Sequence, residues 1–449
     1  MIKLAQWHLK LINIKIKNTN TLGFGIISSG ADITNKGNIT LEDALDSTKP
    51  NIGMYTDDIN TKLENYGKIL GGKNTYGIYG KDITQAGNIE VGDNSIGVFS
   101  NTEAEDTNVD LAGEITVGND KAIGFLASGN KASTITSTSK MKIGKNSFGY
   151  VLRTNGSTLN TNHEDETELQ EGSTYIYSAD AAGNITNKTK LKTVGDRNYG
   201  IYATGNVTNL ANMDLTNGLG NIGMLHLRAK DNTTSKAINR GAITVGSSNS
   251  RKELYSIGMA AGYMDKDGVL QQTGEIENHG TINVVGEKGI GMYAAGVGSK
   301  ATNHGDIELS GKDSIGMYLT DGAKGYNYGN IRTTPNNTAD GIKGVVVANG
   351  AEIYNYGNIE IKGPGNIGIF KAGGKNPGIF NKEDPGQQIP NDIDGSRGLV
   401  ESKASPTGKE IGKAGLKIDA PGDGTAKITR NGKIVSPTHV DPMPSNPDE

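Results

Sequence analysis

The segment NHGTINVVGEKGIGMY, residues 278–293, is matched by a second segment, NHGDIELSGKDSIGMY, residues 303–318. The two segments have the same length and place glycine and apolar residues at the same positions. Each contains two short runs in which β-branched or aromatic residues alternate with other residues, a pattern typical of strands. One such unit is too small to bury its own apolar face. The repeat therefore predicts a fold in which many copies stack and share one core.

Copies of both halves of this unit recur along most of the chain. The N-x-G-x-I half contains Gly37, Gly67, Gly87, Gly113, Gly183, Gly241, Gly280, Gly305, Gly329 and Gly357. The I-G-M-Y half contains Gly53, Gly77, Gly97, Gly124, Gly149, Gly200, Gly223, Gly258, Gly291, Gly316 and Gly368, with a looser copy at Gly344. The alternation predicts an all-β fold, a parallel β-solenoid of about 13–14 coils that ends in a less regular segment.

Stacked coils place equivalent residues about 4.8 Å apart, so the repeat predicts ladders of like side chains. The aromatic ladder would contain Tyr55, Tyr79, Phe99, Tyr202, Tyr293, Tyr318 and Phe370. The asparagine ladder, of a kind that stabilises stacked strands, would contain Asn35, Asn65, Asn278, Asn303, Asn327 and Asn355. In turns such as VGDNSIG, residues 91–97, we expect glycine at backbone positions with positive φ and asparagine as a tolerated substitute.

Three regions follow from where the repeat begins and ends. We assign residues 1–17 to an atypical lead-in or cap and residues 18–380 to the β-helix repeats. Residues 381–449 carry eight of the twelve prolines, and we expect a Pro/Gly-rich segment with short hairpins that is cut short. Loop insertions into the repeats are predicted at 101–110, 153–180 and 261–277.

The insertion at 153–180 is the candidate ligand-binding region. It carries an acidic cluster followed by two tyrosines, and loops on a rigid scaffold often carry function. The candidate ligand contacts are Asp165, Glu166, Tyr175 and Tyr177. Two alternatives remain: a surface insertion without function, or a degenerate coil in which TYIYS stands in place of I-G-M-Y.

Composition and motifs argue against several classes of function. Lysine plus arginine (45) nearly balance aspartate plus glutamate (49), so the strong positive charge typical of nucleic-acid-binding proteins is missing. The chain has no cysteine, which excludes disulfides and thiolate ligands. G-x-G-x-x-G matches at 218–223 and 363–368 precede strand patterns, whereas a dinucleotide site needs a helix there. We therefore expect no cofactor, no metal and no nucleic-acid partner.

Catalytic constellations are also weak. His279 and His304 hold equivalent positions in adjacent copies, but tyrosine holds that position elsewhere, so a surface slot is favoured over a metal pair. Carboxylates at 57–58 and 103–106 lack a patterned basic partner, which enzymes acting on acidic polysaccharides commonly need. We expect no enzymatic activity, and keep a polysaccharide-acting β-helix enzyme as an alternative.

The alternation of N-x-G-x-I with S-I-G-M-Y over residues 18–380 resembles the passenger domains of large autotransporter adhesins, particularly the fusobacterial outer-membrane type. Residues 411–441 are similar to the non-repetitive region that follows the repeats in that group. The resemblance implies a right-handed β-helix, secreted through the outer membrane of a Gram-negative bacterium and displayed on the cell surface. It implies attachment to host cells or other bacteria through glycans or protein receptors.

Proteins of that group also carry a signal peptide and a C-terminal membrane β-barrel, and neither pattern is evident in this sequence. We therefore expect a monomeric passenger fragment whose full-length parent is anchored in the outer membrane by the barrel. Its loops would mediate cell–cell or cell–host attachment. The alternative is a structural stalk without a binding site of its own.

Overall fold

The computed structural model describes residues 8–9, 13–17, 21–228, 234–264, 269–363, 365–371, 378–381, 384–388, 429–430 and 433–434. In these ranges the chain is all-β apart from one turn of 3-10 helix, η1 (Ser250–Lys252). No helix in them has the length and apolar character needed to cross a membrane. The chain divides into two compact units, residues 1–190 with 441–449 (unit 1) and residues 191–440 (unit 2).

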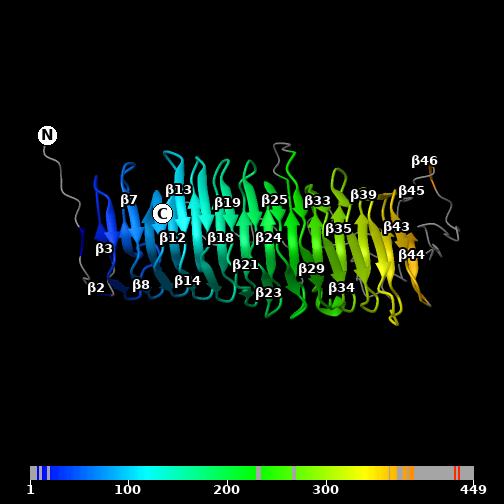
Figure 1. Cartoon of the computed structure of the whole chain (residues 1–449), viewed down its shortest axis with the longest axis horizontal. Helices are drawn as coiled ribbons and strands as arrows, with labels where there is room; N and C mark the ends of the chain where they lie inside the picture. The colour runs from blue at the N-terminus through cyan, green and yellow to red at the C-terminus, as the bar shows by residue number, and fades with distance from the viewer. Residues whose placement is uncertain are drawn as a thin grey trace. The chain divides into compact units, whose positions relative to one another are not determined.

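Unit 1 is built from three parallel sheets that the chain visits in turn (Figure 1). Sheet A contains β1 (His8–Leu9), β4 (Ile33–Asn35), β7 (Lys62–Asn65), β10 (Asp82–Gln85), β13 (Thr107–Leu111), β16 (Ser133–Ser137), β19 (Thr158–Thr161) and β22 (Asn184–Asn187). Sheet B contains β2 (Asn13–Ile16), β5 (Asn38–Leu41), β8 (Lys68–Gly71), β11 (Asn88–Val91), β14 (Glu114–Val117), β17 (Lys140–Ile143) and β20 (Thr167–Leu169). Sheet C contains β3 (Gly23–Ile27), β6 (Asn51–Tyr55), β9 (Thr75–Gly80), β12 (Ile96–Asn101), β15 (Ile123–Ser128), β18 (Phe148–Arg153) and β21 (Thr174–Ser178).

Unit 2 repeats this order of sheets. Its sheet A contains β25 (Asn206–Asn209), β28 (Ala237–Asn239), β33 (Glu275–Asn278), β36 (Lys300–Asn303), β39 (Lys324–Asn327), β42 (Glu352–Asn355) and β45 (Gly378–Asn381). Its sheet B contains β23 (Leu191–Thr193), β26 (Met213–Leu215), β29 (Ala242–Val245), β34 (Thr281–Val284), β37 (Asp306–Leu309), β40 (Asn330–Thr333) and β43 (Asn358–Glu360). Its sheet C contains β24 (Tyr199–Ala203), β27 (Ile222–His226), β30 (Ile257–Ala261), β35 (Ile290–Ala295), β38 (Ile315–Thr320), β41 (Lys343–Val347) and β44 (Ile367–Lys371).

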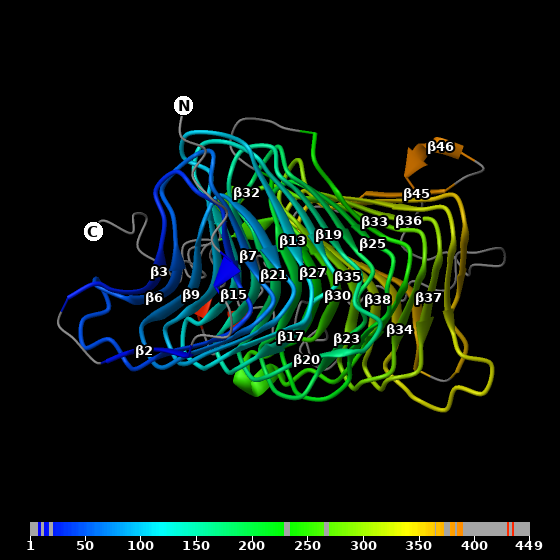
Figure 2. The same ribbon diagram turned by 60° about the vertical axis from the view of Figure 1, so that its left-hand side comes forward.

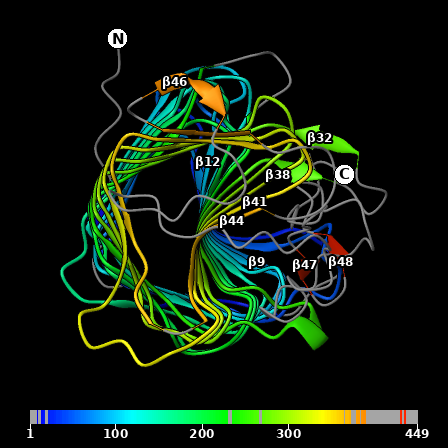
Figure 3. The same cartoon turned by 90° about the vertical axis from the view of Figure 1, so that its right-hand side faces the viewer.

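Within the described residues sheets B and C each comprise 14 strands, so the predicted parallel β-solenoid of 13–14 coils is confirmed. Figure 3 looks toward the ends of the stacks, and in each unit the turns superimpose around a common interior. The strands of sheets A and B alternate buried and more exposed residues, as in β11 and β13. This alternation follows from the two-residue period of a strand with one face on the core.

Antiparallel pairs occur outside this regular pattern. β46 (Asp384–Gln388) turns back against β45, as Figure 2 shows. β47 (Thr429–Arg430) pairs with β48 (Lys433–Ile434), one of the short hairpins predicted near the C-terminus. The rest of the predicted C-terminal segment lies outside the described residues. At the other end, β2 pairs in parallel with β5 over four residues, so residues 13–16 of the predicted lead-in already belong to the stack.

The predicted asparagine ladder is confirmed in both units. Asn35 donates to Asn65 at 2.7 Å in unit 1, and glutamine continues the ladder when Asn65 donates to Gln85 at 2.8 Å. In unit 2 the side-chain amides of Asn209, Asn239, Asn278, Asn303, Asn327 and Asn355 form an unbroken series of hydrogen bonds of 2.8–3.0 Å. The ladder satisfies buried amides that would otherwise destabilise the core.

The predicted aromatic ladder is interrupted. Tyr79 stacks on Tyr55 at 5.2 Å and meets Phe99 at 4.7 Å between ring centroids, and Tyr293 lies 5.9 Å from Tyr318. Aliphatic residues interrupt the series elsewhere: Leu126 follows Phe99, Leu225 follows Tyr202, and Val346 separates Tyr318 from Phe370. Volume and apolarity, rather than continuous ring stacking, are what this position requires.

The expectation that glycine takes the positive-φ position is wrong for the turn at 91–97. There Asn94 has φ 51°, and Asn74 and Asn146 have φ 54° and 52° in their own turns. Asparagine tolerates the left-handed region better than other residues with a Cβ. Its side chain also links turns, because Asn94 donates to Asn74 at 2.7 Å.

Candidate functional site

Residues 153–180 form a coil of the stack, and the prediction of a loop insertion there is wrong. After β18 the chain forms β19, β20 and β21, each of which takes its place in its sheet. β21, with the sequence TYIYS, aligns with β18 so that Tyr150 is opposite Ile176. The alternative interpretation of a degenerate coil is therefore the correct one. The connection between β19 and β20 is longer than the one between β16 and β17, whereas the connection from β20 to β21 has the same length as that from β17 to β18.

Tyr175 and Tyr177 are buried, so the prediction that they contact a ligand from a loop is wrong. Their exposed fractions are 0% and 5%. The ring of Tyr175 lies 5.4 Å from that of Tyr150, and the ring of Tyr177 lies 6.3 Å from that of Phe148. Burial raises the pKa of the Tyr175 phenol, which keeps it neutral. Both tyrosines are structural, because sheet C needs large side chains at these positions.

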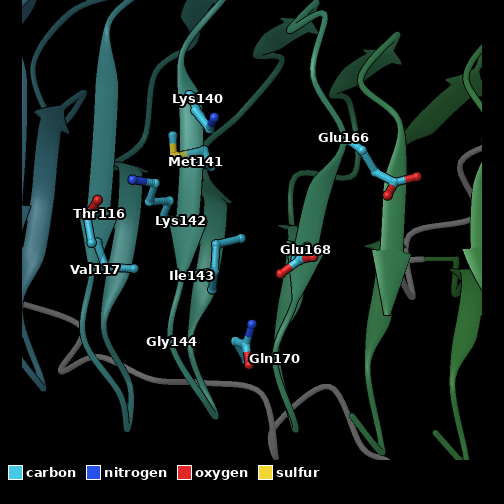
Figure 4. Close-up of a pocket in the computed structure, with 10 residues that line it drawn as sticks. All are labelled: Thr116, Val117, Lys140, Met141, Lys142, Ile143, Gly144, Glu166, Glu168 and Gln170. Atoms are coloured by element: carbon cyan, nitrogen blue, oxygen red, sulfur yellow. The ribbon is translucent and has the colours of Figure 1, made fainter. Parts of the chain in front are cut away.

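Glu166 is exposed and lines an opening between β17 and β20, which we call the seam (Figure 4). Asp165 is exposed too but is not among the residues that line the seam. β17 pairs with β14 over four residues, but with β20 only at Ile143 and Leu169. The seam has a volume of about 550 Å³. It lies where the chain before β20 separates from β17 instead of continuing to pair with it.

Lysines and glutamates line the seam without pairing with one another. Lys140 and Lys142 come from β17, Glu166 and Glu168 come from the segment that forms β20, and the side chain of Glu166 points away from β17 (Figure 4). In a regular ladder such pairs would stabilise each other. No ion pair joins Glu166 or Glu168 to any residue in the described ranges.

The two lysines find other partners. Lys142 Nζ lies 2.7 Å from Glu114 Oε1 on β14, and this hydrogen bond is the main cause that lowers the pKa of Glu114. Lys140 Nζ lies 3.2 Å from Asp165 Oδ2, and this contact chiefly lowers the pKa of Asp165. His163 Nε2 is 3.7 Å from the same carboxylate. Asp165 thus pairs with Lys140, whereas Glu166 has no ion pair within the described ranges.

The unpaired charge in the seam is negative. Lys140 and Lys142 line the seam and pair with Asp165 and Glu114, which lie outside its lining, whereas Glu166 and Glu168 in the lining have no cationic partner in the described ranges. Glu168 and the two lysines were missed by sequence reasoning. The alternation of charge in KMK, residues 140–142, and ETEL, residues 166–169, would have placed them on the outer face.

The other predicted loops are smaller than expected or differ in kind. β13 begins at Thr107, so most of the predicted insertion at 101–110 is the end of β12, a short turn and regular strand. The insertion at 261–277 contains a true hairpin, β31 (Tyr263–Met264) with β32 (Leu270–Gln272), outside the three sheets (Figure 3). Residues 265–268 between them lie outside the described ranges. In the part of the chain that the structure describes, no three His, Asp or Glu side chains are grouped to hold a metal ion.

Comparison with known proteins gives one match. Neither the curated proteins nor the solved structures contain one that matches the chain. A family model described as the BigA third pectate lyase-like domain matches residues 59–330, which is more than half of the chain. Pectate lyase-like β-helices occur in enzymes and in non-enzymes. The chain belongs to the BigA third pectate lyase-like domain family, a β-helix domain of bacterial surface proteins.

Proposed function

We propose that this chain is the passenger part of an autotransporter-type adhesin, displayed at the surface of a Gram-negative bacterium, and that it attaches to host cells or other bacteria. The seam between β17 and β20 carries the proposal, because it offers unpaired charges in a recess of an otherwise regular surface. The four-residue pairing of β17 with β14 holds one wall of the seam in place without a bound ligand. A preformed site loses little conformational entropy when it binds.

The charge of the seam selects the partner. Glu166 and Glu168 lack cationic partners within the described ranges, and the lysines of the seam pair with Glu114 and Asp165. A ligand that brings ammonium or guanidinium groups would complete the pairs that the opened ladder leaves unmade. We therefore propose a protein receptor that presents an extended segment rich in lysine or arginine. Each contact is weak, and attachment of a cell depends on many copies acting together.

Binding of the purified chain to epithelial cells, to bacterial cells and to an immobilised lysine-rich peptide tests this proposal. The variant Glu166→Gln/Glu168→Gln removes both free carboxylates but keeps side-chain volume. Glu90→Gln is the matched control, because Glu90 is an exposed glutamate on β11 of the same sheet. We expect saturable binding that falls about tenfold in the double variant and is unchanged in the control.

The two rival functions predict different results. A stalk would bind none of these targets although folded. An enzyme that acts on acidic polysaccharides would release unsaturated or reducing ends when it is incubated with such polysaccharides. The variant Glu166→Gln/Glu168→Gln would abolish that release. Either outcome would replace the adhesin proposal.

A further inference from the structure

The outer side of sheet A in unit 2 carries stacked aromatic side chains, here called the aromatic face. One row lies in the x position of N-x-G, directly after each sheet A strand, and a second row lies on β39 and β42. Ring centroids are separated by 4.5 Å (His279–His304), 4.9 Å (His304–Tyr328) and 5.0 Å (Tyr328–Tyr356) in the first row, and by 5.1 Å (Tyr326–Tyr354) in the second. Tyr328 is 48% exposed. The proposed function rests on the seam between β17 and β20 and does not involve this face.

The rings present their edges, not their faces, to solvent. The planes of successive rings differ by only 7° to 19°, so each ring covers the face of its neighbour. Stacking of a sugar requires an open ring face, and only the ends of the rows offer one. The rows are instead two ridges of ring edges and hydroxyl groups, flanking the inward-facing Asn327 and Asn355.

The ridges carry free hydrogen-bond donors. The hydroxyl of Tyr354 donates to Glu352 at 2.8 Å. The hydroxyls of Tyr326, Tyr328 and Tyr356 have no hydrogen-bond partner among the described residues. They are thus available to an acceptor on a ligand.

The lysines near the face already have acidic partners. Lys324 lies over the ring of Tyr354 and pairs with Glu352 at 3.2 Å, whereas Lys300 lies over the ring of Tyr326 and shares Glu275, at 3.1 Å, with Arg228. β39 is hydrogen-bonded to β36 on one side and β42 on the other, so an extended peptide cannot add as a further strand. The ligand must therefore bring its own backbone acceptors to the free tyrosine hydroxyls.

We propose that the aromatic face binds a proline-rich segment of a partner protein in the polyproline II conformation. Such a segment has no internal hydrogen bonds, so its carbonyl groups are free to accept from tyrosine hydroxyls. Its turn of three residues rises about 9.3 Å, close to the roughly 9.6 Å of two coil spacings, so proline rings would meet the ridges in register. Aromatic-lined grooves recognise this conformation because it is formed before binding.

Isothermal titration of the whole chain with a synthetic twelve-residue proline-rich peptide without charged residues tests the proposal. A glycine- and serine-rich peptide of equal length is the control ligand. The variant Tyr328→Ala/Tyr356→Ala breaks the first ridge. Tyr66→Ala is the matched control, because Tyr66 holds the same N-x-G position in unit 1, is 49% exposed and has no ring partner among the described residues.

We expect saturable binding of the proline-rich peptide only, weakened about tenfold by Tyr328→Ala/Tyr356→Ala and unchanged by Tyr66→Ala or by Glu166→Gln/Glu168→Gln. Tyr328→Phe/Tyr356→Phe keeps the stacked rings and removes the hydroxyl donors, so it should weaken binding several-fold without disturbing the packing of the first row. Equal binding of the two peptides, an equal loss in Tyr66→Ala, or full binding by both the alanine and phenylalanine variants would overturn the proposal.

Discussion

The side-chain Nδ2 of Asn278 donates a hydrogen bond of 2.9 Å to the side-chain oxygen Oδ1 of Asn303, one turn further along the stack. Asn303 in turn donates to Asn327 at 2.9 Å and to the backbone oxygen of Gly305 at 3.0 Å. Asn303 is fully buried, so water cannot replace it as the hydrogen-bond partner of Asn278, Asn327 or Gly305. The pattern N-x-G thus encodes a chain of bonds that runs from one coil to the next.

Replacing Asn303 with alanine should therefore destabilise unit 2 by about 2–3 kcal/mol, because Asn278 loses its acceptor on Asn303, the buried Oδ1 of Asn327 loses its donor, and a cavity is left between them. The midpoint of urea unfolding, followed by circular dichroism, measures this loss. Asn160→Ala is the control, because Asn160 faces outward on β19, and it should change stability by less than about 0.5 kcal/mol. Equal effects of the two substitutions would show that the ladder contributes nothing.

The glycine of N-x-G is required by close approach of the backbones. A Cβ on Gly305 would lie 1.9 Å from the carbonyl oxygen of Gly280, whereas a Cβ on Gly183 would meet nothing closer than 3.0 Å. We expect Gly305→Ala to destabilise the fold by at least about 3 kcal/mol, beyond the usual range for overpacking, because backbone rather than a side chain must move. Gly183→Ala should cost much less. Thermal unfolding of the two variants compares them directly.

His226 should make unit 2 sensitive to acid. Its ring is fully buried in β27, where Nδ1 accepts from the amide of Glu275 at 3.0 Å and Nε2 donates to the oxygen of Gly205 at 3.2 Å. Burial, with a smaller contribution from Arg228, lowers the pKa of His226 to about 3. The unfolded chain binds this proton near the ordinary pKa of 6.5, so folding loses free energy as the pH falls from about 6.5 to about 3, and none above that window.

The expected loss is about 1.4 kcal/mol for each pH unit within the window. Urea midpoints at pH 7, 5 and 4 test this for the parent chain and for His226→Asn, which cannot take up a proton and should show a flatter dependence. A parent chain whose stability is constant from pH 7 to pH 4 would contradict the assignment.

The sequence allows the stack to be predicted, because Asn and Gly recur wherever hydrogen bonding and close approach admit no other residue. It misleads where a coil lacks these markers. β21 has Tyr175 at the position opposite Gly149, so its turn resembles an insertion although it buries the same surface. The seam could not be predicted for a different reason. Whether Glu166 pairs with Lys140 depends on how far β20 separates from β17, and that separation is a property of the folded ladder.

This distinction leads to a prediction about deletions. Residues 154–178 contain β19, β20 and β21, one strand for each sheet, so their removal joins the end of β18 to the turn before β22 and keeps the order of sheets. Because each turn of a solenoid contacts mainly its neighbours, the shortened chain should remain folded.

Removing residues 158–169 deletes β19 and β20 but leaves β21, which then follows β18 with no strands between them. We expect this smaller deletion to unfold unit 1, as measured by limited proteolysis and the far-ultraviolet β-sheet signal. The opposite ranking, with the smaller deletion tolerated and the larger one not, would mean that residues 153–180 behave as a loop after all.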